Sequence, residues 1–382
     1  SSVADKIIIS LQDGSDPTVV RVGGDTANHT IKNIENIIGS NTADDTIIGN
    51  STNNTIKGGG GDDIIDGTGW NNYLDGELGS DTVSFESVTS VNGISVNIGN
   101  SAVTINGNTY AASSAIRNGF TSTVVNFENI QGSKNADILI GSDESNIIKA
   151  GDGNDTIYGV AGNNYLYGDS GNDTIFSGTG DDFIDGGEDS DTVHYGAATS
   201  GIKVDLSNTS SQNISGGMGK DTIKNIENAI GSNYGDTIKG NNSANTLIGG
   251  TGDDTFIASR GKDTIYGGTL DNSLVSGEIN TISYEDEEEN VIINLQEGKS
   301  GLNTNNGSNS ISITNNSTLY EIQNAIGGAG DDIFISNALV SNIFDGGDHK
   351  TKGDTVDYSN LNLSQAINVT LAGTTFADVI IG

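Results

Sequence analysis

Cysteine is absent from this chain of 382 residues, proline occurs once, and aromatic residues make up 5%. The lack of cysteine excludes a disulfide framework and zinc sites built on thiolates. No apolar run is long enough to form a membrane-spanning helix. Positive charge is also scarce, with 16 Lys and Arg residues against 51 Asp and Glu residues and no basic cluster. We therefore expect neither nucleic-acid binding nor membrane insertion.

The composition leaves little apolar surface for a core. Hydrophobic residues make up 33% of the chain, and the formal net charge is −35. Low hydrophobicity combined with high net charge is typical of chains that stay disordered. Something besides side-chain packing must order such a chain, and the excess of carboxylates favours a cation.

What the chain does contain is a repeat of nine residues, seen most clearly in Gly-Gly-Gly-Gly-Asp-Asp-Ile-Ile-Asp at residues 58–66. An apolar residue recurs at the eighth place of each unit, and an Asp or Asn usually stands two places before it. The apolar residues are Ile47, Ile56, Ile65, Leu74 and Val83 in a first array, Ile130, Leu139, Ile148, Ile157, Leu166, Ile175, Ile184 and Val193 in a second, Ile238, Leu247, Phe256, Ile265 and Leu274 in a third, and Phe334, Ile343 and Val356 in a fourth.

Nine residues accommodate a six-residue turn and a three-residue strand whose middle side chain points inward. Two such units form one 18-residue coil, so the pattern predicts an all-β fold, a right-handed parallel β-roll (β-solenoid) of 18-residue coils with intervening β-strand segments. Aspartates in successive coils would lie about 4.8 Å apart and repel one another. A hard divalent cation would relieve this repulsion, and Ca²⁺, which accepts six to eight oxygen ligands in loose geometry, fits better than Mg²⁺. Zn²⁺ lacks its usual ligands here.

The glycine and aspartate pattern resembles the repeats-in-toxin (RTX) family of calcium-binding β-rolls. That resemblance implies multiple bound Ca²⁺ ions, held by carbonyl groups at the second and fourth places of the unit and by the Asp side chain at the sixth. The turns that open the second and third arrays, which contain Ser133 and Tyr234, depart from the glycine pattern. The metal ligands implied for this chain are Asp45, Gly59, Gly61, Asp63, Gly79, Asp81, Asp137, Gly151, Gly153, Asp155, Gly171, Asp173, Asp182, Gly187, Asp189, Asp191, Asp236, Gly250, Gly252, Asp254, Asp263, Asp332 and Asp354.

Asp and Asn alternate at the sixth place, which divides the two edges of the predicted roll. Asp45, Asp63 and Asp81 fall on one edge of the first array, while Asn54 and Asn72 fall on the other. Asn tolerates left-handed backbone and can form ladders without charge compensation. We therefore predict a one-sided roll, with calcium along the Asp edge and an Asn ladder along the opposite edge.

The other arrays follow this alternation to different degrees. In the second array, Asp182 is the one acidic residue on the Asn edge. In the third array the alternation is weaker, because Asp263 joins Asn245 and Asn272 joins Asp254.

A longer repeat contains the arrays. Each opens with a motif of the type Ile-Glu-Asn-Ile, in which Glu35, Glu128, Glu227 and Gln323 are separated by 93, 99 and 96 residues. Neither end supplies a capping repeat, so we expect a segment of a longer chain. The expected segments are residues 1–36 (the end of a preceding super-repeat), 37–84 (array 1), 85–128 (intervening β segment), 129–194 (array 2), 195–228 (intervening β segment), 229–283 (array 3), 284–324 (intervening β segment), 325–358 (array 4) and 359–382 (the start of a further repeat).

No catalytic motif is present, and His29, His194 and His349 stand on separate elements, where we expect them to be solvated. The chain is therefore not expected to be an enzyme. We expect a structural segment of surface-layer or adhesin type, secreted or at the bacterial cell surface, with self-assembly or a cell-surface polysaccharide as its partner. The RTX resemblance implies type I secretion and folding outside the cell, where calcium is abundant.

Two alternatives stay open. The segment could be the secretion and folding module of an RTX exoenzyme or toxin whose catalytic domain is not in this chain. A carbohydrate-binding groove is the other alternative, which would need a row of aromatic side chains such as Tyr158, Tyr167 and Phe176.

Overall fold

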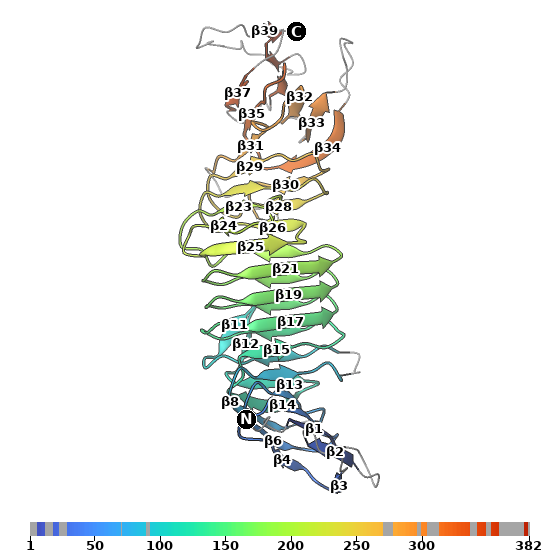
Figure 1. Ribbon diagram of the computed structural model, residues 1–382. Coiled ribbons are helices and arrows are strands. Elements are labelled where there is room, and N and C mark those ends of the chain that lie inside the picture. The colour runs from blue at the N-terminus through green and yellow to red at the C-terminus, as the bar shows by residue number, and fades with distance from the viewer. Residues whose placement is uncertain are drawn as a thin grey trace. The chain divides into compact units, whose positions relative to one another are not determined.

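The computed structural model describes residues 6–11, 18–22, 29–69, 71–88, 92–269, 278–295, 299–303, 313–336, 342–348, 353–358 and 378–380. Every regular element in these ranges is a β-strand, and most strands pair in parallel with their neighbours (Figure 1). Within these ranges no helix has the length and hydropathy needed to cross a membrane. The predicted all-β roll is thus confirmed.

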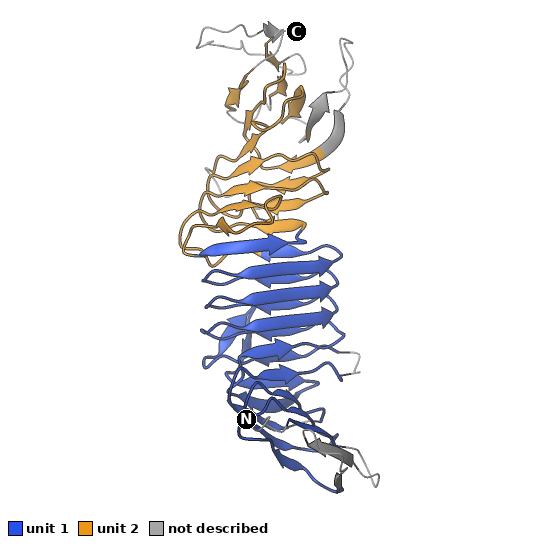
Figure 2. Ribbon diagram, in the orientation of Figure 1, with its two compact units in different colours: residues 1–193, 218–226 blue, residues 194–217, 227–382 orange. Residues whose placement is uncertain are grey.

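The chain divides into two compact units (Figure 2). Unit 1 comprises residues 1–193 and 218–226, and unit 2 comprises residues 194–217 and 227–382.

Unit 1 is a roll whose chain passes back and forth between two sheets. Sheet 1 contains β1 (Ile7–Ser10), β2 (Thr18–Val22), β3 (His29–Ile31), β5 (Thr46–Ile48), β7 (Ile64–Asp66), β9 (Thr82–Ser84), β15 (Asn129–Gln131), β17 (Ile147–Asp152), β19 (Tyr165–Ser170), β21 (Phe183–Glu188) and β25 (Lys220–Lys224). Sheet 2 contains β4 (Asn36–Ile38), β6 (Thr55–Gly60), β8 (Tyr73–Leu78), β10 (Ser95–Asn97), β13 (Ser114–Arg117), β14 (Phe120–Val125), β16 (Ile138–Ile140), β18 (Thr156–Tyr158), β20 (Thr174–Phe176) and β22 (Thr192–His194). A hairpin of β11 (Val103–Ile105) and β12 (Asn108–Tyr110) stands apart from both sheets.

The core of this roll is one apolar side chain deep on each strand. Ile148, Leu166 and Ile184 lie in register, and each is fully buried. Their strands, β17, β19 and β21, are neighbours in the sheet (Figure 1). Partners in register are eighteen residues apart, as in the pair Thr156 and Thr174, so the predicted coil length is confirmed. Alternating side chains point outward because successive residues of a strand face opposite sides of its sheet.

An antiparallel insertion interrupts sheet 2 of unit 1. β10 pairs in parallel with β16, which lies ahead of it in the chain, and β14 pairs in parallel with β8, which lies behind. β13 joins the two by antiparallel pairing with both. Sheet 1 continues past this point without an insertion, since β15 pairs directly with β9. The intervening segment is therefore a three-strand meander built into one sheet of the roll.

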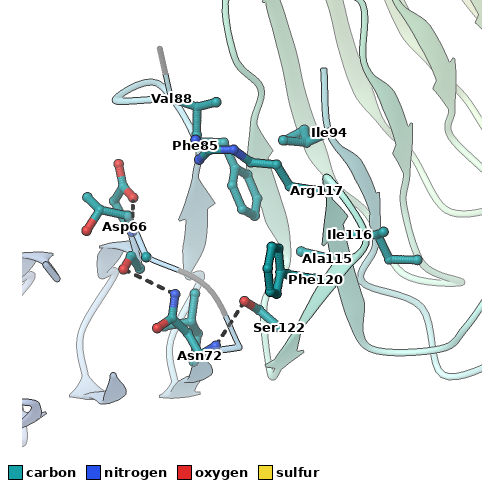
Figure 3. A pocket seen from close by; sticks show the side chains of 14 residues that line it. Asp66, Asn72, Phe85, Val88, Ile94, Ala115, Ile116, Arg117, Phe120 and Ser122 are labelled. Atoms are coloured by element: carbon teal, nitrogen blue, oxygen red, sulfur yellow. Dashed lines mark hydrogen bonds between the residues drawn. The ribbon is translucent and has the colours of Figure 1, made fainter. Parts of the chain in front are cut away.

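A small hollow lies beside this meander, between Asp66, Phe85, Arg117 and Phe120 (Figure 3). Asn72 closes one side, with its backbone N–H donating to Ser122 Oγ at 3.0 Å. The enclosed volume is about 20 Å³, which is room for about one water molecule. The hollow is too small to be a substrate pocket.

Unit 2 follows the same plan. Sheet 3 contains β23 (Lys203–Asp205), β27 (Thr237–Lys239), β29 (Thr255–Ile257), β31 (Thr281–Ser283), β35 (Asn324–Ile326) and β37 (Phe344–Asp345). Sheet 4 contains β26 (Asn228–Ile230), β28 (Thr246–Ile248), β30 (Thr264–Tyr266), β32 (Val291–Asn294), β33 (Lys299–Asn303), β34 (Ile313–Tyr320), β36 (Ile333–Ile335), β38 (Thr355–Asp357) and β39 (Asp378–Ile380). β24 (Gln212–Asn213) is a further short strand of this unit. A second meander, β32–β33–β34, joins β30 to β36.

Two details of the predicted repeat need correction in unit 2. Ile343 does not point inward, because it is 67% exposed and its neighbour Phe344 pairs with Ala325 instead. Asn280, on the turn before β31, follows Asp254 along the edge. Asn272 and Leu274, which were predicted to follow there, lie outside the described residues.

Candidate metal sites

The turns between strands use left-handed backbone at the second and fourth places of the unit. In the turn before β18, Gly151 has φ of 104° and Gly153 has φ of 135°. Glycine adopts such angles freely, and the lack of a Cβ also lets successive turns stack closely. A Cβ on Gly171 would overlap the carbonyl oxygen of Gly153 in the previous coil. The close stacking of backbone on backbone at this fourth place therefore requires glycine at residue 171.

The other glycines of the predicted sites share this conformation. Their φ angles lie between 104° and 154° at Gly59, Gly61, Gly79, Gly171, Gly187, Gly250 and Gly252. Asp189 takes the fourth place in the last turn of the second array with φ of 81°. Asp189 is thus predicted to act through its carbonyl group, as the glycines are.

A ladder of side chains runs along each edge at the sixth place. The Oδ1 atom of each residue accepts the backbone N–H of the sixth residue one coil earlier, as in the 2.7 Å bonds from Asp137 to Asp155 and from Asp155 to Asp173. Asn residues do the same, with Asn146 donating to Asn164 at 2.9 Å. The ladder is therefore common to Asp and Asn and does not itself require a metal.

The second carboxylate oxygen distinguishes the interior aspartates. Their Oδ2 atoms are buried and have no hydrogen-bond partner, although the residues are at most 2% exposed. The residues are Asp63, Asp81, Asp155, Asp173, Asp182 and Asp254. A buried charged oxygen without a partner is costly, so each of these atoms is where a cation would be stabilising.

Burial also raises the pKa values of these interior aspartates. Desolvation, opposed by the backbone N–H on Oδ1 and reinforced by neighbouring aspartates, raises the pKa of Asp155 to about 8. The pKa of Asp254 is likewise about 8 and that of Asp81 about 7. The pKa values of the remaining members are about 6, at Asp63, Asp173 and Asp182.

Backbone carbonyl oxygens lie close to the Oδ2 atoms of the interior aspartates. A Cβ on Gly168 would collide with both Asp173 Oδ2 and the carbonyl oxygen of Gly186 in the next coil, and one on Gly249 would meet Asp254 Oδ2 and the Gly267 carbonyl oxygen. Two oxygens from adjoining turns therefore converge at each place. Among the described residues no three Asp, Glu or His side chains come together in a metal-binding group. The donor set is one carboxylate plus carbonyl groups, which suits Ca²⁺ and no softer metal.

The aspartates that open the rows are satisfied by the protein itself. Asp137 accepts the N–H of Ser133 at Oδ2 and, at Oδ1, the Ser133 hydroxyl and the N–H of Ile94. The same arrangement joins Asp236 to Ser232 and Ile202.

The first and fourth arrays open in a related way. Asp45 accepts N–H groups of Ser40 and Ile7, and Asp332 accepts those of Gly328 and Val291. The residues Ile7, Ile94, Ile202 and Val291 lie on or directly before the first strand of an intervening segment, so each such strand closes the start of a row.

Three further predicted ligands each accept the backbone N–H of the preceding sixth-place residue. Asp263 Oδ2 accepts the hydroxyl of Ser259 at 2.9 Å, while its Oδ1 accepts the N–H of Asn245. Asp354 accepts the N–H of Asp332 at Oδ1, at 2.9 Å. The last aspartate of the second array, Asp191, accepts the N–H of Asp173.

The Asp row changes edge within each unit. In unit 1, the turns of Asp63 and Asp81 lead into sheet 1, but those of Asp155 and Asp173 lead into sheet 2. In unit 2, the turn of Asp254 leads into sheet 3, whereas those of Asp332 and Asp354 lead into sheet 4. The sequence predicted one edge for each array but gave no sign of this alternation.

The recurring Ile-Glu-Asn-Ile motif ends one row and starts another, which sequence reasoning missed. Glu128 Oε2 accepts the N–H of Asp81, so its carboxylate stands where the next aspartate would be. The carbonyl of Glu128 also accepts from Asn146 Nδ2. In unit 2, Gln323 Oε1 likewise accepts the N–H of Asn280. The fourfold recurrence of the motif was the signal that could have revealed this role.

His194 corrects another expectation. It is half-buried rather than solvated, and burial lowers its pKa to about 4. Its Nδ1 accepts the N–H of Gly196 at 2.9 Å. The imidazole is thus a neutral local acceptor. Nothing is described of the His29 side chain, and His349 lies outside the described residues.

The RTX calcium-binding nonapeptide repeat family model matches residues 40–69, 131–166, 167–198, 230–265 and 239–274. These segments include Asp63, Asp155, Asp173, Asp182 and Asp254, whose buried Oδ2 atoms lack a partner, whereas Asp81 lies outside them. No curated protein matches the chain. Coil length, glycine conformation and aspartate placement agree with this match, and the matched segments of the chain are RTX calcium-binding nonapeptide repeats.

Proposed function

We propose that this chain is a calcium-dependent structural segment of a surface-layer or adhesin type protein, exported by type I secretion and folded outside the cell. RTX repeats bind calcium and occur generally in secreted proteins. The finer assignment rests on the repetition of the same roll architecture in each unit. Each of the two units consists of coils interrupted by a meander.

The observation that carries the calcium dependence is the row of buried carboxylate oxygens without partners. At the pH of a secretion medium these aspartates must either hold a proton or face a cation. Where calcium is scarce, the carboxylates repel and the thin core cannot order the chain. Where calcium is plentiful, its binding free energy becomes folding free energy.

The composition agrees with folding after export. The chain has no cysteine and one proline, so neither disulfide exchange nor repeated proline isomerisation would delay folding once calcium is met. A long unfolded acidic chain also stays soluble through self-repulsion.

The second candidate is a secretion and folding module of an exoenzyme or toxin. The calcium rows support it equally, because they would serve either parent. A test that separates the two is electron microscopy of the chain with and without calcium. Ordered sheets or filaments formed only with calcium would support the surface-layer type, whereas monodisperse rods would favour the module.

The carbohydrate groove has weaker support. Tyr158 and Phe176 stack on each other with ring centroids 4.3 Å apart and an interplanar angle of 11°. In this arrangement each ring covers one face of the other ring, and mainly the ring edges point outward. A sugar platform needs free ring faces, so this row does not favour polysaccharide binding.

The calcium dependence itself is tested by circular dichroism of the full chain. We expect a coil spectrum in the metal-stripped protein, a β-sheet spectrum in a few millimolar CaCl₂, and reversal by chelator. Full sheet content and an unchanged melting temperature without metal would overturn the proposal.

A further inference from the structure

We infer that asparagine side-chain amides take the place of the cation in this roll, so that calcium binds only at the interior Asp turns. This inference rests on the calcium-dependent folding proposed above and adds where the ions bind and where they do not. It assigns cations to the turns of Asp63, Asp81, Asp155, Asp173, Asp182 and Asp254. It assigns none to the turns of Asn72, Asn164 and Asn280, nor to the capped aspartates Asp45, Asp137, Asp236 and Asp332.

The first step is that Asp and Asn turns share one backbone. In the turn of Asn164, Val160 has φ of 69° and Gly162 has φ of 83°. The turn of Asp173 has the same left-handed places, with φ of 70° at Asp169 and 125° at Gly171. The Oδ1 atom of each accepts an N–H from the previous coil. At the sixth place, the two turns differ in the second terminal atom of the side chain, which is nitrogen in Asn164 and oxygen in Asp173.

The second step concerns that atom. In the turn of Asp173, Oδ2 converges with the carbonyl oxygen of Gly186, and nothing in the protein donates to Oδ2. In the turn of Asn164, Nδ2 donates to the carbonyl oxygens of Gly159, Ala161 and Gly162 at 3.3, 3.1 and 3.3 Å. A positively polarised N–H group of Asn164 thus binds carbonyl oxygens of its own turn, at the place where Asp173 presents an oxygen without a donor.

The pattern recurs at the other interior asparagines. Asn72 Nδ2 donates to the carbonyl oxygen of Gly67 at 3.1 Å, and Asn280 Nδ2 to that of Glu321 at 3.2 Å. In both turns a hydrogen bond replaces the meeting of two oxygens. A neutral amide also adds no charge to a chain whose net charge is already −35, so these turns need no counter-ion.

The third step excludes the opening aspartates. Asp137 and Asp236 each receive three hydrogen bonds, two from a serine of the same turn and one from the backbone N–H of Ile94 or Ile202. Their carboxylates are already solvated by the protein, so a cation would have to compete with these donors. Calcium therefore begins one coil into each row.

The inference predicts an unusual outcome for matched substitutions. Asp173→Asn supplies the amide that closes its own turn, as Asn164 does, so the roll stays folded with one fewer calcium site. Asp137→Asn changes an equally buried carboxylate in the same row, yet removes no site. Asn164→Asp replaces the amide nitrogen with a carboxylate oxygen that has no donor. It therefore creates a calcium site on the edge where most turns carry Asn.

The experiment counts bound calcium in the full chain and these three variants, by native mass spectrometry and by equilibrium dialysis against ⁴⁵Ca²⁺. We expect one ion fewer in Asp173→Asn, the wild-type number in Asp137→Asn, and one ion more in Asn164→Asp. The calcium midpoint for folding, followed by circular dichroism, should fall in Asp173→Asn and rise in Asn164→Asp.

The outcomes separate the two proposals. A wild-type chain that binds no calcium would overturn the proposed function. A wild-type chain that binds calcium but loses the same number of ions in Asp137→Asn as in Asp173→Asn would overturn only the inference. If Asp173→Asn does not fold, the ion count of Asn164→Asp still decides the matter. A gain of one calcium ion in Asn164→Asp would support the inference, and an unchanged count would refute it.

Discussion

The two edges of the second array have the same backbone but different side chains. Along one edge, Asp155 and Asp173 present buried oxygens that the protein leaves without donors. Along the other, Asn164 closes its turn with hydrogen bonds from its amide. Both ladders have the same N–H to Oδ1 bonds, so neither coil length nor backbone geometry decides where a metal is needed. A single terminal atom, oxygen or nitrogen, makes that decision turn by turn.

Removal of calcium should have the largest effect on the difference between the Asp edge and the Asn edge. We expect chelation to abolish most of the sheet signal, because every row of Asp turns loses its counter-charge at once. Hydrogen exchange should show faster exchange first around Asp155 and Asp173 and later around Asn146 and Asn164. Uniform protection of both edges after metal removal would contradict the proposed difference between them.

A substitution of glycine should have the next largest effect, and it acts on both kinds of turn alike. In Gly171→Ala, the residue has φ of 125° and the new Cβ would overlap the Gly153 carbonyl oxygen. We expect a loss of about 3 kcal/mol in the free energy of unfolding with calcium present.

Gly107→Ala is the matched control for this substitution. Gly107 also has positive φ, 80°, but has open space around it, so its replacement should cost about 1 kcal/mol. Urea unfolding in calcium would measure both. Equal losses would show that stacking of turns is not the reason for the glycine.

The sequence predicted these local features well because they are set within one unit of nine residues. Inward side chains such as Leu166, the coil of eighteen residues and the paired glycines all follow from the spacing. The error at Ile343 arose because Ile343 and Phe344 are adjacent apolar residues, and a shift of one residue exchanges the inward and outward faces of a strand.

The change of edge could not be predicted from spacing. It depends on which strands of the meander pair forward and which pair backward, as β10 does with β16 and β14 with β8. Likewise, the role of Glu128 depends on contact with Asp81, which is 47 residues away in the chain. Such pairings are made by the whole fold, whereas the turn chemistry is local.

The pH dependence of the metal-free chain is the third test of the difference between edges. The pKa values of about 6 to 8 at Asp63, Asp155 and Asp254 lie above the value of about 4 for an unfolded aspartate. Between these limits the folded chain binds more protons than the unfolded chain, so its stability falls as pH rises. Asparagine turns contribute nothing to this trend.

We therefore expect the metal-stripped chain to retain more sheet structure at pH 5 than at pH 8, as measured by circular dichroism. Calcium affinity should rise over the same interval, since the ion must displace the extra protons. A metal-free chain whose sheet content is flat between pH 5 and pH 8 would mean that the carboxylates are not buried as described.

The smallest expected effect distinguishes a capped aspartate from a capped asparagine. Ser133→Ala removes the hydroxyl that donates to Asp137 Oδ1 at 2.9 Å. Ser142→Ala removes the hydroxyl that accepts from Asn146 Nδ2 at 3.0 Å. Each loss should lower the free energy of unfolding by about 1 kcal/mol.

The two serine variants should differ in their response to pH. The Ser133 hydroxyl stabilises the charged form of Asp137, whose pKa burial already raises, so its loss raises that pKa further. Ser133→Ala should therefore destabilise the chain more at pH 8 than at pH 5, whereas Ser142→Ala should cost the same at both because Asn146 does not titrate. Urea unfolding of both variants at the two pH values, with calcium held constant, measures the contrast. Parallel losses at both pH values would mean that the serine contributes packing and not solvation of the opening carboxylate, and Asp137 would then be open to a cation after all.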